Sequence, residues 1–329
     1  MFALSKTKSV IFLGVVAALF TAVYKAMDNI TVHNFIIAPD GLTAAFSYLI
    51  VGGWTGCVFG VLFSLLFGKR LIDPDFSGIV FKNAKMHKNA AIAGFISAGS
   101  TLFLLWGNQF GDAGAITALS STMLFFVMIY DVMTKQAGKR ILIPVIAAVI
   151  GSMLAAYSGS VVITLTGVLY VVVISNSLGL LSEVAEQKGV RASDGVNLFI
   201  WRFFWLATSG TAIALTVSWM RGYSDMLFAT ILNSVAYLPF IIVTMLFVFL
   251  GVGIKLTLKK KSSLSIVLLL STIQIAFAFP ITIIGEWLKP GLFGGISDSP
   301  VVWMIRGAGI LLLIWSVISL RDPIPKEET

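Results

Sequence analysis

Charged residues are scarce in this sequence, and the side chains that bind metals are scarcer still. Asp, Glu, Lys and Arg make up 12% of the 329 residues, about half the share of an ordinary soluble domain. There is one cysteine, Cys57, and there are two histidines, His33 and His87, both in predicted loops. This inventory excludes an intrachain disulfide and a cysteine-rich metal site. We therefore expect no metal, no cofactor and no enzyme that depends on one.

The chain also lacks a long polar segment and the glycine-lysine motif of nucleotide-hydrolysing transporters. Hydrophobic residues make up 58% of it, and the mean hydropathy is +0.97. These values predict an all-α integral membrane protein with a single membrane domain. The formal charge of +8 does not indicate nucleic-acid binding, because the basic residues lie in short loops between apolar runs. The predicted partners are the lipid bilayer and a small-molecule substrate.

Ten apolar runs predict ten transmembrane helices. They lie at about 8–27, 42–67, 90–107, 112–134, 141–158, 161–183, 196–219, 226–250, 264–287 and 301–320. The first run continues to Met27 without a convincing cleavage site, so we interpret it as a retained span rather than a signal peptide. The links at 108–111 and 159–160 leave room only for turns, so the spans that they join run antiparallel.

The basic residues predict the orientation. With both termini in the cytoplasm, 18 of the 23 Lys and Arg residues lie in inner segments. The five others are Lys25, Arg202, Arg221, Lys289 and Arg306. An excess of Lys and Arg marks cytoplasmic loops. We expect a multi-pass protein of the cell (inner or plasma) membrane with both termini cytoplasmic.

Two stretches carry polar stripes. Gly107–Arg140 begins with a polar corner (Asn108, Gln109, Gly111 and Asp112) and continues as a predicted helix over 112–134. Along this helix Thr117, Ser121, Leu124, Met128 and Asp131 recur at helical spacing. The stretch Leu264–Trp287 places Ser271, Gln274 and Thr282 on one side and Glu286 at its end. We interpret the two helices as facing walls of one central pathway.

The ten spans divide into two halves, residues 1–160 and 161–329. A shift of about 155 residues carries spans one, two, four and five roughly onto six, seven, nine and ten, and Asp131 onto Glu286. Five is an odd number, so a duplicated half must insert upside down relative to the first. Two inverted five-helix repeats around a midplane site are typical of secondary transporters.

Four stretches resemble the drug/metabolite transporter superfamily, in its ten-span form with two EamA-type halves. They are AALFTAVYKAMDN at the end of span one, DAGAITA at 112–118, PITIIGEW at 280–287 and RGAGILLLIWSVISL at 306–320. The first contains Lys25, where that family often keeps a lysine. The resemblance covers nearly the whole chain and implies alternating-access transport of a small organic solute, with a cavity lined by spans one, three, four, six, eight and nine.

Polar residues at mid-depth are the predicted substrate-binding set, because a buried polar group in hydrocarbon needs a partner or a function. The set is Lys25, Ser121, Asn176, Tyr237 and Gln274. Lys25, at the outer end of span one, could bind a carboxylate or phosphate. The alternative is that Lys25 reaches the interface or pairs with Asp28, and that the others only bond across helices, at about 0.6 kcal/mol each.

Four charged residues are the predicted gating or coupling set: Asp131, Glu183, Arg202 and Glu286. Arg202 with one acid, Asp131 or Glu183, would form a gate on the cytoplasmic side, and a plain structural ion pair remains the alternative. The run Lys259–Lys261 is interpreted as an anchor at the inner surface. The glycines Gly52, Gly56 and Gly60 favour close helix packing, so both a monomer and a homodimer stay open.

Taken together, these patterns predict a secondary active transporter that moves a small polar or amphipathic metabolite by alternating access, coupled to protons or to exchange. The alternative is a lipid-handling flippase or an integral membrane enzyme with a cavity open to the bilayer.

Overall fold

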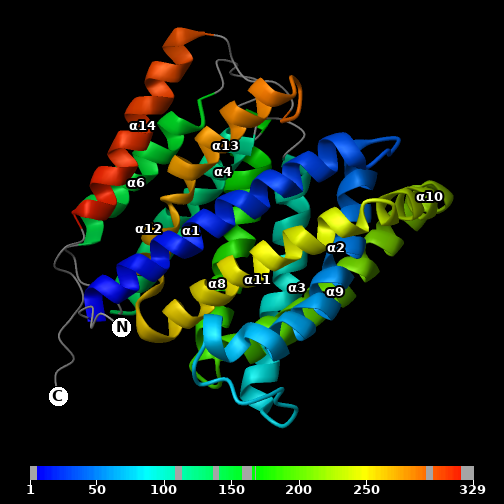
Figure 1. Ribbon diagram of the computed structural model, residues 1–329, viewed down its shortest axis with the longest axis horizontal. Coiled ribbons are helices and arrows are strands. Elements are labelled where there is room, and N and C mark those ends of the chain that lie inside the picture. Colours follow the sequence, from blue (N-terminus) through cyan, green and yellow to red (C-terminus); the bar gives the residue numbers. More distant parts are fainter. Residues whose placement is uncertain are drawn as a thin grey trace.

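A computed structural model describes residues 6–107, 113–135, 141–157, 165–166, 168–293 and 299–319. All regular secondary structure in these ranges is helical (Figure 1). The first half contains α1 (Lys6–Ile30), the π-helix η1 (Thr31–Phe35), α2 (Gly41–Phe63), the π-helix η2 (Ser64–Ile72), α3 (Ala84–Gly107), α4 (Ala113–Ser121), α5 (Met123–Met133) and α6 (Leu142–Ala155). The predicted corner at 108–111 and the link at 159–160 lie outside the described residues.

The second half begins with a π-helix, η5 (Val168–Ser175). It continues with α8 (Asn176–Val190), α9 (Gly195–Met220), α10 (Ser224–Val235), α11 (Leu238–Lys261), α12 (Leu264–Ser271), α13 (Gln274–Leu288) and α14 (Pro300–Ile318). Within the described ranges, nine helical segments of 19 to 32 residues are long and apolar enough to cross a membrane. The prediction of a multi-pass helical membrane protein is therefore confirmed.

One predicted span is shorter than expected. The run 141–158 contains α6, which has 14 residues. At 1.5 Å per residue this helix is about 21 Å long, less than the roughly 30 Å of a bilayer core. Of the ten expected spans, nine are long helices and the fifth is this short one.

Two spans lie further along the chain than predicted. The sixth continues through α8 to Val190, and the eighth begins at Leu238 and ends at Lys261, instead of covering 226–250. Pro239 explains the second difference, because proline fits the first turn of a helix, where α11 has it, but not the interior of a helix over 226–250. As a result, acidic and basic residues expected at the membrane surface lie within the helices.

Spans four and nine, predicted as continuous helices over 112–134 and 264–287, each have a local irregularity near the middle, where backbone hydrogen bonds run to the carbonyl three residues earlier while the dihedral angles stay helical; we call each irregularity a break. The first break is at Thr122, between α4 and α5, and the second at Thr272 and Ile273, between α12 and α13. At each break a threonine hydroxyl donates to the carbonyl three residues earlier, Thr122 Oγ1 to Leu119 O and Thr272 Oγ1 to Leu269 O, both at 2.7 Å. Such side-chain bonds compete with the helical backbone pattern.

The helices pack so that the two halves interleave. α3 packs against α8 and α9, and α11 packs against α1 and α2, while α6 and α14 lie side by side at one edge (Figure 1). The α6–α14 contact brings Gly151 and Gly309 together backbone to backbone. In α2, Gly56 faces Phe203 and Gly60 faces Phe199, both on α9, so these glycines serve packing within the monomer.

Two aspartates begin spans two and seven. Asp40 accepts a hydrogen bond from Thr43 N at 2.9 Å, and Asp194 accepts one from Asn197 N at 2.8 Å, as helix N-caps do. Asp40 lies outside the spans and also pairs with Arg221 at 2.9 Å. Partial burial raises the pKa of the Asp40 carboxyl, but the hydrogen bonds from Thr43 and Arg221 outweigh it, so the pKa lies below its usual value.

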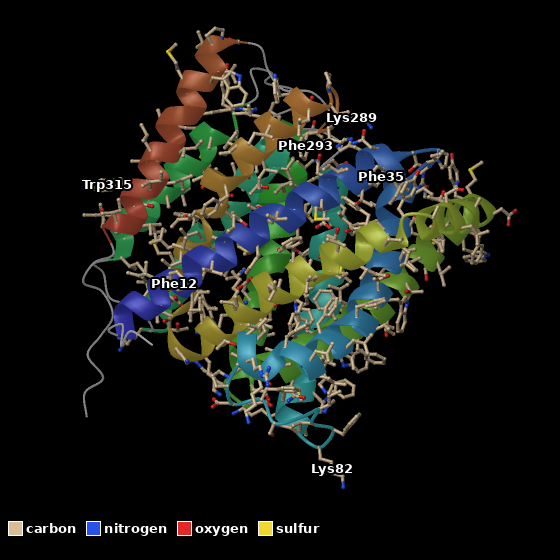
Figure 2. The ribbon with its side chains drawn as sticks, in the orientation of Figure 1. Phe12, Phe35, Lys82, Lys289, Phe293 and Trp315 are labelled. Atoms are coloured by element: carbon tan, nitrogen blue, oxygen red, sulfur yellow. The ribbon has the colours of Figure 1, made fainter. Side chains whose placement is uncertain are left out.

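Large apolar side chains cover the outside of the bundle. Phe12 and Trp315 point away from it (Figure 2), and they are 60% and 48% exposed. Such a surface suits a hydrocarbon environment. Lys82 and Lys289 lie at opposite ends of the molecule (Figure 2), as expected for an inner and an outer loop.

Candidate functional site

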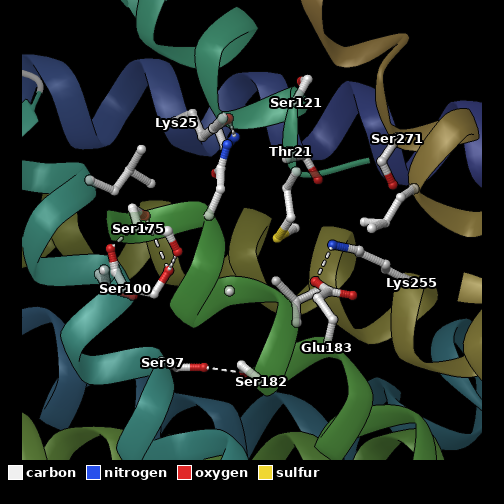
Figure 3. A pocket seen from close by; sticks show the side chains of 18 of the residues that line it. Thr21, Lys25, Ser97, Ser100, Ser121, Ser175, Ser182, Glu183, Lys255 and Ser271 are labelled. Atoms are coloured by element: carbon white, nitrogen blue, oxygen red, sulfur yellow. Dashed lines mark hydrogen bonds and ion pairs between the residues drawn. The ribbon is translucent and has the colours of Figure 1, made fainter. Parts of the chain in front are cut away.

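A polar cavity of about 170 Å³ lies between helices of both halves. Most of the residues that line it carry hydroxyl, amide or charged groups (Figure 3). The polar lining residues are Thr21, Tyr24 and Lys25 from α1, Ser97, Ser100 and Thr101 from α3, Ser120 and Ser121 from α4, Ser175 from η5, Asn176, Ser182, Glu183 and Glu186 from α8, Arg202 from α9, Lys255 from α11, Ser271 from α12 and Gln274 from α13. Seven of the nine long spans contribute to this polar lining.

One side of the cavity is built around the break between α4 and α5. Lys25 Nζ donates to Ser120 Oγ at 2.7 Å, and Gln274 Nε2 donates to Ser121 Oγ at 3.0 Å. Asn176 Nδ2 reaches across from α8 to Leu119 O at 3.1 Å and to Thr122 Oγ1 at 3.0 Å. The break thus exposes backbone and hydroxyl groups that side chains from three other spans contact.

The other side of the cavity carries a cluster of five charges, which we call the charge cluster: Glu183, Glu186, Arg202, Lys255 and Lys259. Glu183 pairs with Lys255 at 2.7 Å (Figure 3) and with Lys259 at 2.6 Å. Glu186 pairs with Lys259 and, at 2.6 Å, with Arg202 Nε. The Lys259 side chain is fully buried. The cluster joins α8, α9 and α11.

Between these two sides of the cavity, serine pairs link α3 to helices of the second half. Ser97 and Ser182 share a hydrogen bond at 2.7 Å, and Ser100 donates to Ser175 O at 2.9 Å (Figure 3). Arg202 Nη2 also donates to Ser97 Oγ at 3.0 Å. These bonds satisfy polar groups that would otherwise be costly inside a membrane.

Six of the nine predicted site residues line the cavity, and the structure brings them together. They are Lys25, Ser121, Asn176, Glu183, Arg202 and Gln274. Arg202 forms an ion pair, as one reading of the sequence expected, but its partner is Glu186 rather than Asp131 or Glu183.

Tyr237 does not line the cavity. The sequence placed it at the centre of span eight, but it precedes the first residue of α11, and its ring stacks on Phe35 with centroids 4.6 Å apart. The later start of α11 before Pro239 explains the difference.

Asp131 and Glu286 do not line the cavity; each accepts hydrogen bonds from nearby backbone N–H groups. Asp131, fully buried, accepts hydrogen bonds from the backbone N–H of Ser265, at 2.7 Å, and from its hydroxyl, at the start of α12. Glu286 accepts bonds from the N–H groups of Gly291 and Phe293, both at 2.6 Å, and so orders the turn after α13. These contacts give both acids a structural role.

Sequence reasoning missed Glu186, Lys255 and Lys259. Glu186 follows Glu183 by one helical turn, and Lys259 follows Lys255 by one turn, so each pair occupies one helix face. That spacing was the available signal. It was overlooked because spans six and eight were predicted to end at 183 and 250, which placed Glu186, Lys255 and Lys259 beyond them.

A second, more apolar cavity of about 120 Å³ adjoins the first and shares Tyr24, Thr101, Arg202 and Val252 with it. Asp28 and Tyr48 lie in its wall, and the Tyr48 hydroxyl donates to Asp28. The described residues contain no group of three His, Cys, Asp or Glu placed to hold a metal ion. The two adjoining cavities together offer a polar end and a less polar end.

No family model matches the chain, and no curated protein matches it. Among solved structures, the chain is similar to one described only as "Crystal structure of protein", over 95% of this chain and 97% of that one. The identity is 15% and the TM-score 0.52. At this identity the likeness concerns the fold alone, so the chain is a multi-pass helical membrane protein with a full-length structural neighbour.

Proposed function

We propose that this protein is a secondary transporter that moves a small polar or amphipathic metabolite across the membrane by alternating access. One observation carries the proposal: a cavity lined by hydroxyl, amide and charged groups lies against two broken spans, one from each half. Polar groups at this depth are expensive in lipid, and they mark substrate or ion pathways. Discontinuous helices in corresponding positions of two halves are typical of transporter binding sites.

Matching sequence motifs support a duplicated origin for the two halves. Asp-Gly begins span two at residue 40 and span seven at residue 194. The pattern Leu-x-Ser-Thr occupies 119–122 and 269–272, so the same residues stand at both breaks. In both motif pairs the two copies are separated by close to the predicted shift of about 155 residues, and they occupy the same kind of local structure.

The packing also supports two related halves. Span three packs against spans six and seven, and span eight packs against spans one and two. These contacts are equivalent if the halves are copies, because spans one, two and three then correspond to spans six, seven and eight. With an odd number of spans per half, the repeats are inverted. The drug/metabolite transporter superfamily, which the sequence resembles, has this architecture.

The charge cluster suggests which end of the pathway is closed. Lys255 and Lys259 on α11 pair with Glu183 and Glu186 on α8 near the ends of both helices predicted to face the cytoplasm. Spans one and three are the inverted counterparts of spans six and eight, and among the described residues no ion pair joins them. This asymmetry favours a state closed on the cytoplasmic side, whose alternate state would break the cluster.

The test is uptake by the purified protein in proteoliposomes. A thermal-stability screen over amino acids, sugars, nucleosides, quaternary amines and lipids first identifies a solute that raises the melting temperature. We expect that solute to exchange across the membrane of loaded proteoliposomes. Gln274→Ala, at the broken helix, should lower the rate by about tenfold or more, because it removes a buried hydrogen bond.

Leu311→Ala is the matched control, because Leu311 is 69% exposed on the outer face of α14; its rate should equal that of the wild type. A solute that binds but does not cross would contradict the proposal. So would conversion of the solute to a product by the protein in detergent, and competition by lipids alone would favour a flippase instead.

A further inference from the structure

Lys25 is a cation in the cavity wall whose hydrogen-bond partner is a neutral hydroxyl. Its Nζ donates to Ser120 Oγ at 2.7 Å, and no carboxylate of the described residues lies within ion-pair distance of it. Asp28, one turn later on α1, is bound to Tyr48 instead. An ammonium group has three donors, so Lys25 retains capacity for a ligand.

The two acids of the charge cluster already have cationic partners. Glu183 and Glu186 are held by Lys255, Lys259 and Arg202 in the charge cluster. With Lys25 and Asp28 included, four cations stand against three carboxylates, which leaves one cation in excess. The acids are therefore not available to a positively charged solute, whereas an anion would supply the missing charge. Inside a low-dielectric bundle this difference is large.

The cavity also offers acceptors. Gln274 is 5% exposed, and its Oε1 has no hydrogen-bond partner within the described part of the chain. The hydroxyls of Thr21 and Ser271 donate to backbone carbonyls of their own helices, and their oxygen lone pairs remain available to a donor. Unused acceptors call for a ligand with hydroxyl or amino donors.

We propose that the solute is a small organic anion that carries hydroxyl or amino groups, with its carboxylate or phosphate bound by Lys25. The inference rests on the proposed transport function and names the substrate class of the same cavity. A volume of about 170 Å³ suits a molecule of few carbon atoms, since drug-sized pockets measure roughly 300–1,000 Å³.

The experiment compares each anion with an uncharged analogue on purified full-length protein at constant ionic strength. The pairs are L-lactate with lactamide, D-gluconate with D-glucose, and glycerol 3-phosphate with glycerol; choline is the cationic probe. We expect at least one anion to raise the melting temperature, with its analogue and choline at the same concentration having no effect. The carboxylate and phosphate arms distinguish the two headgroups.

Variants then test the role of Lys25. Lys25→Gln should weaken binding of that anion by about tenfold or more, since a charge-assisted hydrogen bond is lost. Lys25→Arg, which keeps the charge, should retain most of the affinity. Lys289→Gln, which removes an exposed lysine outside the cavity, should bind as the wild type does.

Three outcomes would overturn the inference: equal stabilisation by an uncharged or cationic probe, unchanged anion binding by Lys25→Gln, or no stabilisation by any anion. The comparison of probes on the wild-type protein decides the matter even if Lys25→Gln does not fold. Exchange of glucose or choline by proteoliposomes, without any anion, would leave transport standing and reject the anion. Binding that depends on Lys25 without exchange would leave the anion site standing and reject transport.

Discussion

Lys259 shows how the interior of this protein tolerates charge. Its side chain is fully buried, and its ammonium group lies 2.6 Å from one Glu183 oxygen and also contacts Glu186. An isolated buried ammonium costs several kcal/mol even after relaxation, so its carboxylate partners are essential. Arg202 and Lys255 complete the neutralisation of the two acids.

Removing Lys259 should therefore leave one oxygen of Glu183 and one of Glu186 buried without a charged partner. We predict that Lys259→Met lowers the stability of the protein by about 3–5 kcal/mol, the usual cost of breaking a buried ion pair from one side. The measurement is thermal unfolding in detergent. The double variant Lys259→Met with Glu186→Gln should recover part of the loss, because the buried Glu186 carboxylate, which has lost one of its two cationic partners, is then neutral.

Lys260→Met is the matched control. The next lysine along the chain pairs with Asp75 near the surface, and exposed pairs contribute little. Its melting temperature should stay close to that of the wild type. Equal losses of stability in Lys259→Met and Lys260→Met would show that the buried ion pairs contribute no more than the exposed one.

At the scale of elements, the contact between α6 and α14 depends on two glycines. A Cβ on Gly309 would lie 2.6 Å from the backbone N of Ala155, and one on Gly151 would lie 2.8 Å from Gly309 O. Because these neighbours are backbone atoms, no side-chain rotation can relieve the clash. The short helix α6 thus approaches its partner more closely than a helix with larger residues could.

We predict that Gly309→Ala destabilises the protein by about 1–3 kcal/mol, as overpacking does. Gly307→Ala, two residues earlier on the same helix, should be neutral or slightly stabilising, because a Cβ there has open space within 4 Å of it and alanine favours helix. The melting temperatures of the two variants make the comparison. A loss with Gly307→Ala as large as with Gly309→Ala would contradict this account.

At the scale of the whole molecule, the distribution of basic residues predicts which end faces the cytoplasm. Lys82 lies at one end of the bundle and Lys289 at the other (Figure 2). The first belongs to the Lys-rich set of segments predicted to be inner, and the second to a loop predicted to be outer.

Labelling of single cysteines tests this orientation in intact cells. Cys57→Ala removes the one natural cysteine, and Lys82→Cys or Lys289→Cys then introduces a new one. We predict that a membrane-impermeant maleimide labels the cysteine at 289 in intact cells, and the cysteine at 82 only after permeabilisation. The reverse pattern would invert the topology and place the charge cluster at the outer end of the pathway.

The amino-acid sequence by itself determined the helical membrane class and most helix positions. Span seven, predicted at 196–219, is α9 at Gly195–Met220, and span three, predicted at 90–107, ends at Gly107 as expected. Hydropathy and N-capping are local properties, because they depend on the residue and the solvent around its own helix. Six of the nine predicted site residues line the cavity, and they could be singled out because a polar side chain amid an apolar run is conspicuous.

Only the tertiary structure decided which charges meet. Glu186 and Lys259 are 73 residues apart in the chain, and each looks like a surface residue until the other is present to neutralise it. Likewise Tyr237 and Asp131 were assigned to the pathway by position, but their partners Phe35 and Ser265 come from distant segments. A buried charge is stable only with its partner in place, so its location is a property of the whole fold.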